Sequence, residues 1–552
     1  MVKKNPRLRP HSFLIFLLFA FLFGLQVWPR LGQDSPAGDE PVDVGDGYYY
    51  WKGDVISDAR HPPLAKGLQA LPLLAMGLDS KDHLQSATYE RRDHRFLFVL
   101  NRDRFETILA VSRSVTLLFG LGIGLTLFLI LRFESAPLLW TALILWAFEP
   151  ALLAFSGLVL ADVPLTFFFL ICAWRFQRLL ESPSRPGAII SGFLTALAVA
   201  AKFSAVLLLP LYLMLEWTHR KSLKPSGRKN LNPLWRRWVW GLGAAVLTLA
   251  LIYLPGTLVI PGFRDPLSYF WDGFTSMASF SEHPTYFRGI LSTENHWAYY
   301  PAAFLLKSPI PFLILLAAAG VLAFSGRLKI PAWQWISPIL FFAALTPFHN
   351  IGLREILPVY PFFILVAARA GEWMWSRRPQ GSRVFPILVS GLLLIQVISV
   401  GTSFPSTLSY FNELVPPDKK IYWLGDSNLD IGQDTKRMAE EARARGWDHI
   451  KLAAFGTVDP SLYGMKWDYW TQRDLAGPQP GWVYLVNAEF IQLGRAFMPQ
   501  SGPVLDGWLL KIPPSGRIGD TWYFFIVPGT PRPDPSPRVY SAPPYDLLAK
   551  SS

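Results

Sequence analysis

The sequence is poor in cysteine and in charge: Cys172 is the single cysteine among 552 residues, and charged residues make up 17% of the chain. One cysteine excludes an intrachain disulfide and a cysteine-based metal site, so any domain outside the cytoplasm must be stable without a disulfide bond. Soluble domains carry about 25% charged residues. The shortage of charge therefore argues against an ordinary cytosolic protein, and the hydrophobic content of 51% argues against a disordered or collagen-like chain.

Long apolar segments stand in place of the missing charge. Crossing a bilayer takes about 20 apolar residues. Eleven runs reach or approach this length, near 12–28, 106–131, 137–155, 163–178, 187–201, 203–217, 238–257, 304–324, 334–348, 355–374 and 384–402. Aromatic residues make up 15% of the chain and supply Trp and Tyr for interfacial belts. The pattern predicts an all-α polytopic membrane protein with roughly eleven transmembrane helices.

The distribution of positive charge predicts the topology. The first apolar run ends at the bulky residues Val27-Trp28-Pro29-Arg30 rather than at a small-residue cleavage site, which favours a retained helix over a signal peptide. Residues 1–402 carry 37 basic and 24 acidic side chains, a net +13, whereas residues 403–552 carry 15 and 16, a net −1. This asymmetry is typical of positive-inside topology rather than of nucleic-acid binding. The N-terminus and the basic loops 219–237 and 376–383 are therefore expected on the cytoplasmic side of the cell (inner) membrane.

An odd number of spans places the C-terminal part outside the cytoplasm. We expect a membrane domain over 1–402 with a large first outer loop, 31–105, then a small α/β domain over 403–527 and a proline-rich tail over 528–552. Within the α/β domain the predicted elements are strands at Ile421–Leu424, Ile450–Phe455, Trp482–Asn487 and Trp522–Val527, and a helix at Asp434–Arg445.

Ionisable residues are costly at membrane depth, and in this chain six separate segments send them to the outer side. They are Asp39, Glu40, His61, Lys66, Glu149, Asp162, Lys202, His349, Arg354 and Glu355. Each one taken alone reads as a loop residue at a wet interface. As a set they predict a site, because several lie inside otherwise apolar sequence.

Such a set suits a substrate with a charged head and a membrane-buried tail. A carboxylate can act as general base on an incoming hydroxyl, and cations can hold a phosphate leaving group. The sequence contains neither a nucleotide-binding P-loop nor a dinucleotide fingerprint, which argues against a soluble nucleotide donor.

The string His61-Pro62-Pro63-Leu64-Ala65-Lys66 resembles the HPPLGK-type motif of the protein O-mannosyltransferase family. That resemblance implies a GT-C fold and a polyprenyl-phosphate sugar donor. Asp39-Glu40 resembles the acidic pair of the family's first outer loop, and Asp162 its second-loop acidic position. Three further segments resemble those of bacterial relatives: Ile351–Pro358, Tyr410–Leu414 and Asp426–Asp434. The first of them resembles the G-x-R-Y-x-L-P pattern of those relatives.

The chain also departs from the family. Ala65 stands in place of the usual glycine, and Glu355 in place of an aromatic residue. The loop 258–303 is too short for the β-trefoil domain of the eukaryotic enzymes. A protein acceptor is therefore not implied, and a protein, a lipid and a glycan stay open as carriers of the acceptor hydroxyl.

By this resemblance the catalytic candidates are Asp39 and Glu40. Asp39 would be the general base of an inverting transfer, and Glu40 would orient Asp39 or a substrate hydroxyl. The alternative for both is a solvated loop acid. Asp162 would bind the acceptor or a divalent cation; the alternative is a helix N-cap.

The candidates for binding the donor phosphate are His61, Lys66, Lys202 and Arg354. For Lys66 the alternative is snorkelling to lipid headgroups, and for Lys202 it is a helix end. His283, His296 and Trp297 would contact the sugar or lipid, with an interfacial aromatic belt as the alternative. Asp426, Asn428 and Asp430 begin like a calcium loop, but Gly432 comes one place late and Arg437 stands where the closing glutamate belongs.

Taken together, the sequence predicts a lipid-phosphate-sugar-dependent glycosyltransferase, with mannose as the sugar that the resemblance suggests. The expected partners are a polyprenyl-phosphate sugar, a hydroxyl-bearing acceptor and membrane lipid, with no nucleic acid. No cofactor is demanded by the sequence, and a divalent cation stays open without support from ligand spacing. The rival interpretations are a polytopic transporter or lipid flippase and a non-catalytic assembly protein on the same scaffold.

Overall fold

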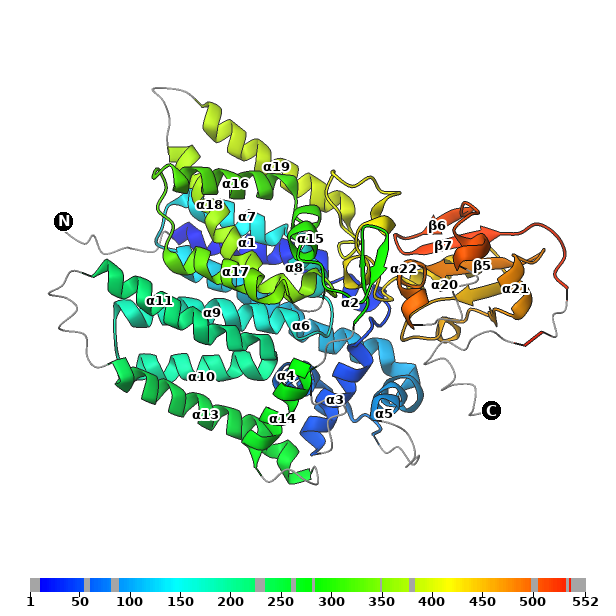
Figure 1. The fold of residues 1–552 in the computed structure, drawn as a ribbon, viewed down its shortest axis with the longest axis horizontal. Helices are drawn as coiled ribbons and strands as arrows, with labels where there is room; N and C mark the ends of the chain where they lie inside the picture. Colours follow the sequence, from blue (N-terminus) through cyan, green and yellow to red (C-terminus); the bar gives the residue numbers. More distant parts are fainter. Residues whose placement is uncertain are drawn as a thin grey trace.

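The structure, a computed structural model, describes residues 10–53, 60–80, 89–223, 234–259, 265–279, 283–347, 350–376, 383–497, 505–532 and 536–537. Its larger part is a body of helices, and a small sheet lies at the end of the molecule opposite the N-terminus (Figure 1). The C-terminal end of α11, whose last turn carries His219, Arg220 and Lys221, lies on the N-terminal side, at the end away from the sheet (Figure 1).

Each of the eleven apolar runs contains a helix. The helices are α1 (Pro10–Val27), α6 (Phe105–Leu131), α7 (Ala136–Ala147), α8 (Pro150–Phe155), α9 (Asp162–Glu181), α10 (Arg185–Ala201), α11 (Leu208–Ser222), α13 (Leu234–Val259), α15 (Tyr299–Lys307), α16 (Ile310–Phe324), α17 (Ala332–Leu345), α18 (Tyr360–Ser376) and α19 (Val384–Ser403). The chain is thus mostly helical and apolar, as predicted.

The number of spans is smaller by length and composition than the roughly eleven predicted. Within the described residues five helices are long and apolar enough to cross a membrane, and a sixth results if α15 and α16, bent by 118°, count as one. Three more, α7, α10 and α17, are apolar but shorter. Proline and polar residues explain the difference: several runs break at a proline near the start of the next helix, as at Pro150 and Pro309.

The first outer loop is itself helical. It contains α2 (Arg30–Gln33), α3 (Glu40–Lys52), α4 (Pro63–Ala70), the 3₁₀ turn η1 (Leu71–Met76) and α5 (Tyr89–Arg95), followed by η2 (Phe96–Leu100) and η3 (Arg102–Arg104). A small core of its own holds it together, in which the rings of Tyr48 and Phe96 stack at 4.9 Å between centroids. The loop is therefore a folded platform beside α6.

A five-stranded sheet forms the C-terminal domain, in the order β4-β3-β5-β7-β6. Its strands are β3 (Ile450–Ala453), β4 (Asp468–Tyr469), β5 (Val483–Asn487), β6 (Gly516–Ile518) and β7 (Trp522–Ile526), and its helices are α20 (Thr435–Ala444), α21 (Gln472–Ala476) and α22 (Ala488–Phe497). Strand β3 runs parallel to β4 and β5, whereas β7 is antiparallel to β5 and β6. Three of the four predicted strands and the predicted helix are confirmed.

The predicted strand at Ile421–Leu424 is wrong. Lys420–Tyr422 is a short 3₁₀ turn, η6, and Leu424 forms an isolated bridge to Phe287 instead of joining the sheet. Phe287 belongs to the hairpin of β1 (Thr285–Phe287) and β2 (Ile290–Ser292). The apolar residues Ile421 and Leu424 pack into the core of the helical body. They are apolar because they are buried there, and the apolar pattern was wrongly interpreted as a strand.

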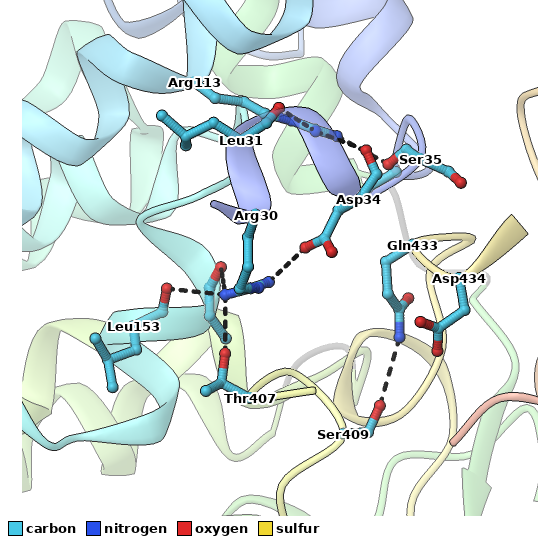
Figure 2. A network of polar contacts seen from close by, with 12 residues as sticks. Arg30, Leu31, Asp34, Ser35, Arg113, Leu153, Thr407, Ser409, Gln433 and Asp434 are labelled. Atoms are coloured by element: carbon cyan, nitrogen blue, oxygen red, sulfur yellow. Dashed lines mark hydrogen bonds and ion pairs between the residues drawn. The ribbon is translucent and has the colours of Figure 1, made fainter. Parts of the chain in front are cut away.

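The segment that follows α19 folds back onto the helices before the sheet begins. Leu408, Phe411 and Leu429 belong to the main core of the helical body, whereas the separate core of the sheet domain starts at Met438. Polar contacts reinforce this return: Arg30 Nη1 donates to Thr407 Oγ1 at 2.8 Å (Figure 2). The sheet domain is therefore held against the helical body by a packed connection. Of the predicted tail 528–552, most residues lie outside the described part of the chain.

Candidate active site

Helix breaks bring five charged side chains from distant segments into one cluster. Asp39 precedes α3, Asp162 begins α9, Lys202 separates α10 from the 3₁₀ turn η4 (Phe203–Leu207), and Arg354 and Glu355 lie in the 3₁₀ turn η5 (Leu353–Val359). Lys202 Nζ lies 2.7 Å from Asp162 Oδ1 and 2.8 Å from Glu355 Oε2. Arg354 Nη1 donates to Asp39 Oδ2 at 3.0 Å. We call this set the charged cluster.

Asp39 is the most accessible acid of the charged cluster, with 54% of its side chain exposed. Its carboxylate makes no capping bond to α3, although it stands at the N-cap position. The surrounding protein disfavours the charged form, but the positive charges of Arg354, His61 and Lys66 outweigh that effect and hold the pKa of Asp39 below its ordinary value. Asp39 is thus an ionised, reachable carboxylate.

Glu40, the next residue, is fully buried and points the other way. Its carboxylate pairs with the guanidinium of Arg113 on α6 through bonds of 2.8 Å and 2.5 Å, and it accepts from the backbone N–H groups of Ala37 and Val159 at 2.8 Å and 2.7 Å. This corrects one expectation, because a carboxylate so enclosed does not reach a substrate hydroxyl. What stays compatible is the orienting role, since Glu40 fixes the start of α3 directly behind Asp39.

The sequence analysis did not predict a role for Arg113. It also donates to the backbone oxygens of Leu31, Asp34 and Ser35, at 2.9, 2.8 and 2.8 Å, and so holds the whole approach to Asp39 (Figure 2). The available signal was a lone arginine within the apolar run 106–131. An ionisable residue in that position needs a buried partner.

Lys66 is buried near Asp39, within the folded first outer loop. Its Nζ is 2.8 Å from Asp46 Oδ2 and 3.5 Å from Asp43 Oδ1, and only 4% of its side chain is exposed. It therefore does not snorkel to lipid, and its positive charge acts on Asp39 from behind. Burial raises the pKa of Asp43 to about 7, and the negative charges of Asp39 and Asp46 add to this effect. The positive charge of Lys66 opposes it.

A cavity of about 300 Å³ opens beside the charged cluster. One end is charged, where Arg60, His61, Lys202 and Glu355 line it. The remaining wall is largely apolar and includes Phe203, Val206, Leu207, Phe274, Met277 and Leu345. Its lining thus combines a charged region, which we call the head region, with an apolar region. His61 lies at this charged end. Burial raises the pKa of Glu355, but the positive charges of Lys202, Arg354 and His61 outweigh burial and lower it.

The C-terminal domain completes the rim of the site. Asp426 and Glu489 lie close enough to Arg354 and Asp39 to interact electrostatically with both. Burial raises the pKa of each of these two carboxyls, and for Glu489 the neighbouring acids Asp426, Asp430 and Asp39 raise it further. Asp426 has a positive φ of 56°, a backbone conformation that is uncommon for residues other than glycine. The packing of the next two residues, Ser427 and Asn428, against Gly352 holds the turn in this conformation.

The remaining candidates divide into two. His283 joins the rim, since its Nε2 lies 3.7 Å from Asp426 Oδ2. His296 is anchored through its backbone N–H to Asn350 Oδ1 at 2.5 Å, and Trp297 has 79% of its side chain exposed. The roles predicted for His296 and Trp297 stay predictions, and His349 lies outside the described residues.

Asp162 is not a helix N-cap: Ala161 takes that position, and the Asp162 carboxylate accepts from Lys202. Within the described part of the chain, no group of three or more His, Cys, Asp or Glu side chains is arranged to hold a metal ion. The charged cluster owes its arrangement to pairing of acids with Lys202 and Arg354.

No protein-family model and no curated protein sequence matches the chain. Similar solved structures exist. ArnT from Cupriavidus metallidurans, solved bound to undecaprenyl phosphate, is 12% identical, with a TM-score of 0.49 over 94% of this chain and 98% of that one. Its apo state gives 12% and 0.49 over 92% and 97%.

An oligosaccharyltransferase from Archaeoglobus fulgidus, solved with a tethered acceptor peptide, is also similar. It is 11% identical, with a TM-score of 0.45 over 83% of this chain and 63% of that one. At these scores the functional argument rests on the residues of this chain.

Proposed function

We propose that this multi-pass membrane protein is a glycosyltransferase that moves a sugar from a polyprenyl-phosphate donor to a hydroxyl acceptor on the extracytoplasmic face. The observation that carries the proposal is the exposed, ionised carboxylate of Asp39, paired with Arg354 beside a cavity that has a charged end and an apolar wall. The resemblance of His61–Lys66 and Asp39-Glu40 to the protein O-mannosyltransferase family suggests mannose as the sugar.

The cavity accounts for both parts of such a donor. His61 and Lys202 line the cavity, and Arg354 precedes its lining residue Glu355 in η5. These three cationic side chains can hold a phosphate by charge-assisted hydrogen bonds, while the apolar wall receives the first units of the isoprenoid. Lys202 already binds Glu355, so an arriving phosphate takes over Lys202 Nζ from that carboxylate. Asp162 keeps its 2.7 Å contact with Lys202 and orients the ammonium group.

The chemical step follows from the position of Asp39. As the acceptor oxygen forms a bond to the anomeric carbon, its proton passes to the Asp39 carboxylate. The bond between that carbon and the phosphate oxygen breaks, and the lipid phosphate leaves with the electron pair and is stabilised by the cations. Attack from the face opposite the phosphate inverts the configuration. Glu40 and Lys66 act as positioning residues behind Asp39.

The test is a donor-consumption assay with the full chain in lipid and labelled polyprenyl-phosphate hexoses. We expect consumption of one hexose donor and a product of inverted configuration. D39N should lower the rate about 10²- to 10⁴-fold, the usual worth of general base catalysis, at unchanged protein level. The matched control is D448N, an exposed aspartate of the sheet domain, which should react like the wild type.

Three outcomes contradict the proposal. An active D39N protein removes the base assignment, and a product of retained configuration removes the single-displacement step. No consumption of any donor by folded protein supports the non-catalytic interpretation, or the transporter interpretation if the lipid then crosses the bilayer.

A further inference from the structure

One face of α22 leads from the charged cluster to a second hollow. Glu489 in its first turn faces Asp426 and Asp39, and Gln492 and Arg495 follow at three-residue spacing, which places all three side chains on one side of the helix. Six residues of α-helix from Glu489 to Arg495 span about 9 Å. The helix thus forms a short track from Glu489, whose carboxyl interacts electrostatically with Asp39, to Arg495.

The hollow is a groove of about 820 Å³ between the sheet domain and the helical body. Its walls come from α22, from the β1–β2 hairpin, from the turn at Tyr422 and from β6 and β7. In Figure 1 the green hairpin lies beside α22, between the helical body and the sheet. We call it the interdomain groove. It is distinct from the cavity of about 300 Å³ beside Lys202, which has a different set of lining residues.

Aromatic rings and cations share the interdomain groove. Tyr286, Tyr422 and Tyr523 line it and lie close enough to one another for electrostatic interaction. Three cations, Arg495, Lys511 and Arg517, also line it, against one acid, Asp418. The described lining therefore carries a net charge of +2.

Gln492 joins α22 to the opposite wall of the interdomain groove. It is 3% exposed and lines the groove. Its Nε2 donates to the backbone oxygens of Ile421 and Leu424 at 2.7 Å and 3.2 Å. These two bonds hold the helix and the turn at Tyr422 in place, so the groove has a fixed shape.

We propose that the interdomain groove binds the acceptor, and that the acceptor is a glycan carrying an anionic group, either carboxylate or phosphate. The inference rests on the proposed function and names its acceptor class. Sugar rings stack on the tyrosine faces, and the anion binds Arg495, Lys511 or Arg517. Because these cations hold the anionic group in the interdomain groove, the neutral hydroxyl end of the glycan is the end that extends along α22 toward Asp39.

The experiment measures binding without any donor, so that its failure is separate from failure of the transfer assay. The full chain in lipid nanodiscs is titrated with fluorescently labelled tetragalacturonate, with phosphorylated mannotetraose and with neutral mannotetraose. We expect one of the two anionic probes to bind at least about tenfold more tightly than the neutral one, and that preference to shrink with added salt. Which anion binds identifies the carboxylate or the phosphate.

Variants localise the binding. K511E and Y422A should each weaken the anionic probe at least about tenfold, since both residues line the interdomain groove and are exposed. The matched control is K466E, a charge reversal at an exposed lysine of the same domain outside the groove. Equal loss in K466E, no effect in K511E, or no preference for either anionic probe overturns the proposal.

Discussion

The two sides of the first outer loop use the same chemistry for opposite purposes. On the rim, Asp39 pairs with Arg354 while 54% of its side chain stays exposed. On the inner side, Glu40 pairs with Arg113, and both side chains are almost completely enclosed. Two adjacent carboxylates with two arginine partners thus differ in burial and in the number of hydrogen bonds that they accept. Burial decides which pair can open for a substrate and which one holds the fold.

Energetics explain the division. A buried pair is stable only as a pair, because losing one partner leaves an uncompensated charge that costs about 3–5 kcal/mol. A pair at a wet surface is worth at most about 1 kcal/mol, so an incoming phosphate or hydroxyl can replace one partner at little cost. Lys202, with 12% of its side chain exposed, stands between these extremes. Four substitutions test this division, from the largest expected effect to the smallest.

Removing the buried arginine should have the largest effect. R113M leaves the Glu40 charge unpaired and frees the backbone of Leu31–Ser35, so the free energy of unfolding in mixed micelles should fall by about 3–5 kcal/mol and transfer should disappear. The double variant E40Q/R113M removes both charges and should recover part of that loss. The control R178M, at a pair exposed to 60% on the arginine side, should change stability by less than about 1 kcal/mol. A stable, active R113M protein contradicts the anchoring role.

Removing the rim arginine should affect activity more than stability. In R354Q the carboxyl of Asp39 keeps the unfavourable surroundings but loses the largest charge that opposes them, so the pKa of Asp39 rises. A base must be ionised to act, so the acid limb of the pH–rate profile moves to higher pH and the rate at neutral pH drops roughly a hundredfold. The profile of donor consumption from about pH 3 to about pH 8 measures the position of the acid limb and the rate at neutral pH. An unmoved acid limb shows that Asp39 and Arg354 are not coupled.

Adding a methyl group at Gly352 tests the contact between η5 and the turn at Asp426. A Cβ there would lie 1.9 Å from Ser427 Oγ, so G352A forces Arg354 and the turn apart and should cost about 1–3 kcal/mol of stability. S427G in the same chain removes the clashing group and should restore most of the loss. The control G391A meets nothing within 4 Å and should not destabilise the protein. Indifference of the protein to G352A would mean that this contact is loose.

The smallest effect is expected at Asp43, whose pKa is raised to about 7. The unfolded chain ionises this carboxyl near its ordinary value, so the folded state holds the proton over a wider range of pH. The contribution to stability is therefore complete at acid pH and is lost as pH rises through about 7. D43N should flatten the dependence of the melting temperature on pH between about 4 and 8. A wild-type protein whose stability rises with pH over this window contradicts that sign.

Much of the candidate site was readable from the sequence because charge is conspicuous in apolar surroundings. Asp162, Lys202 and Arg354 stood out for that reason, whereas Asp39 was indicated by the family resemblance, and the structure brings the four together. Glu489 did not stand out, because a glutamate at a helix start in a polar domain is common. Its approach to Asp39 depends on how the sheet domain docks, which no local pattern records.

Composition and periodicity were sufficient to predict an apolar, helical membrane body followed by a small α/β domain, since hydrophobic burial and strand or helix periodicity act locally along the chain. The folded arrangement selects which of two neighbouring carboxylates faces the solvent and makes Arg113 the anchor of the other. It also made Gln492 and three tyrosines share a groove. Those choices depend on contacts between residues far apart in the chain, where burial and charge pairing act through space.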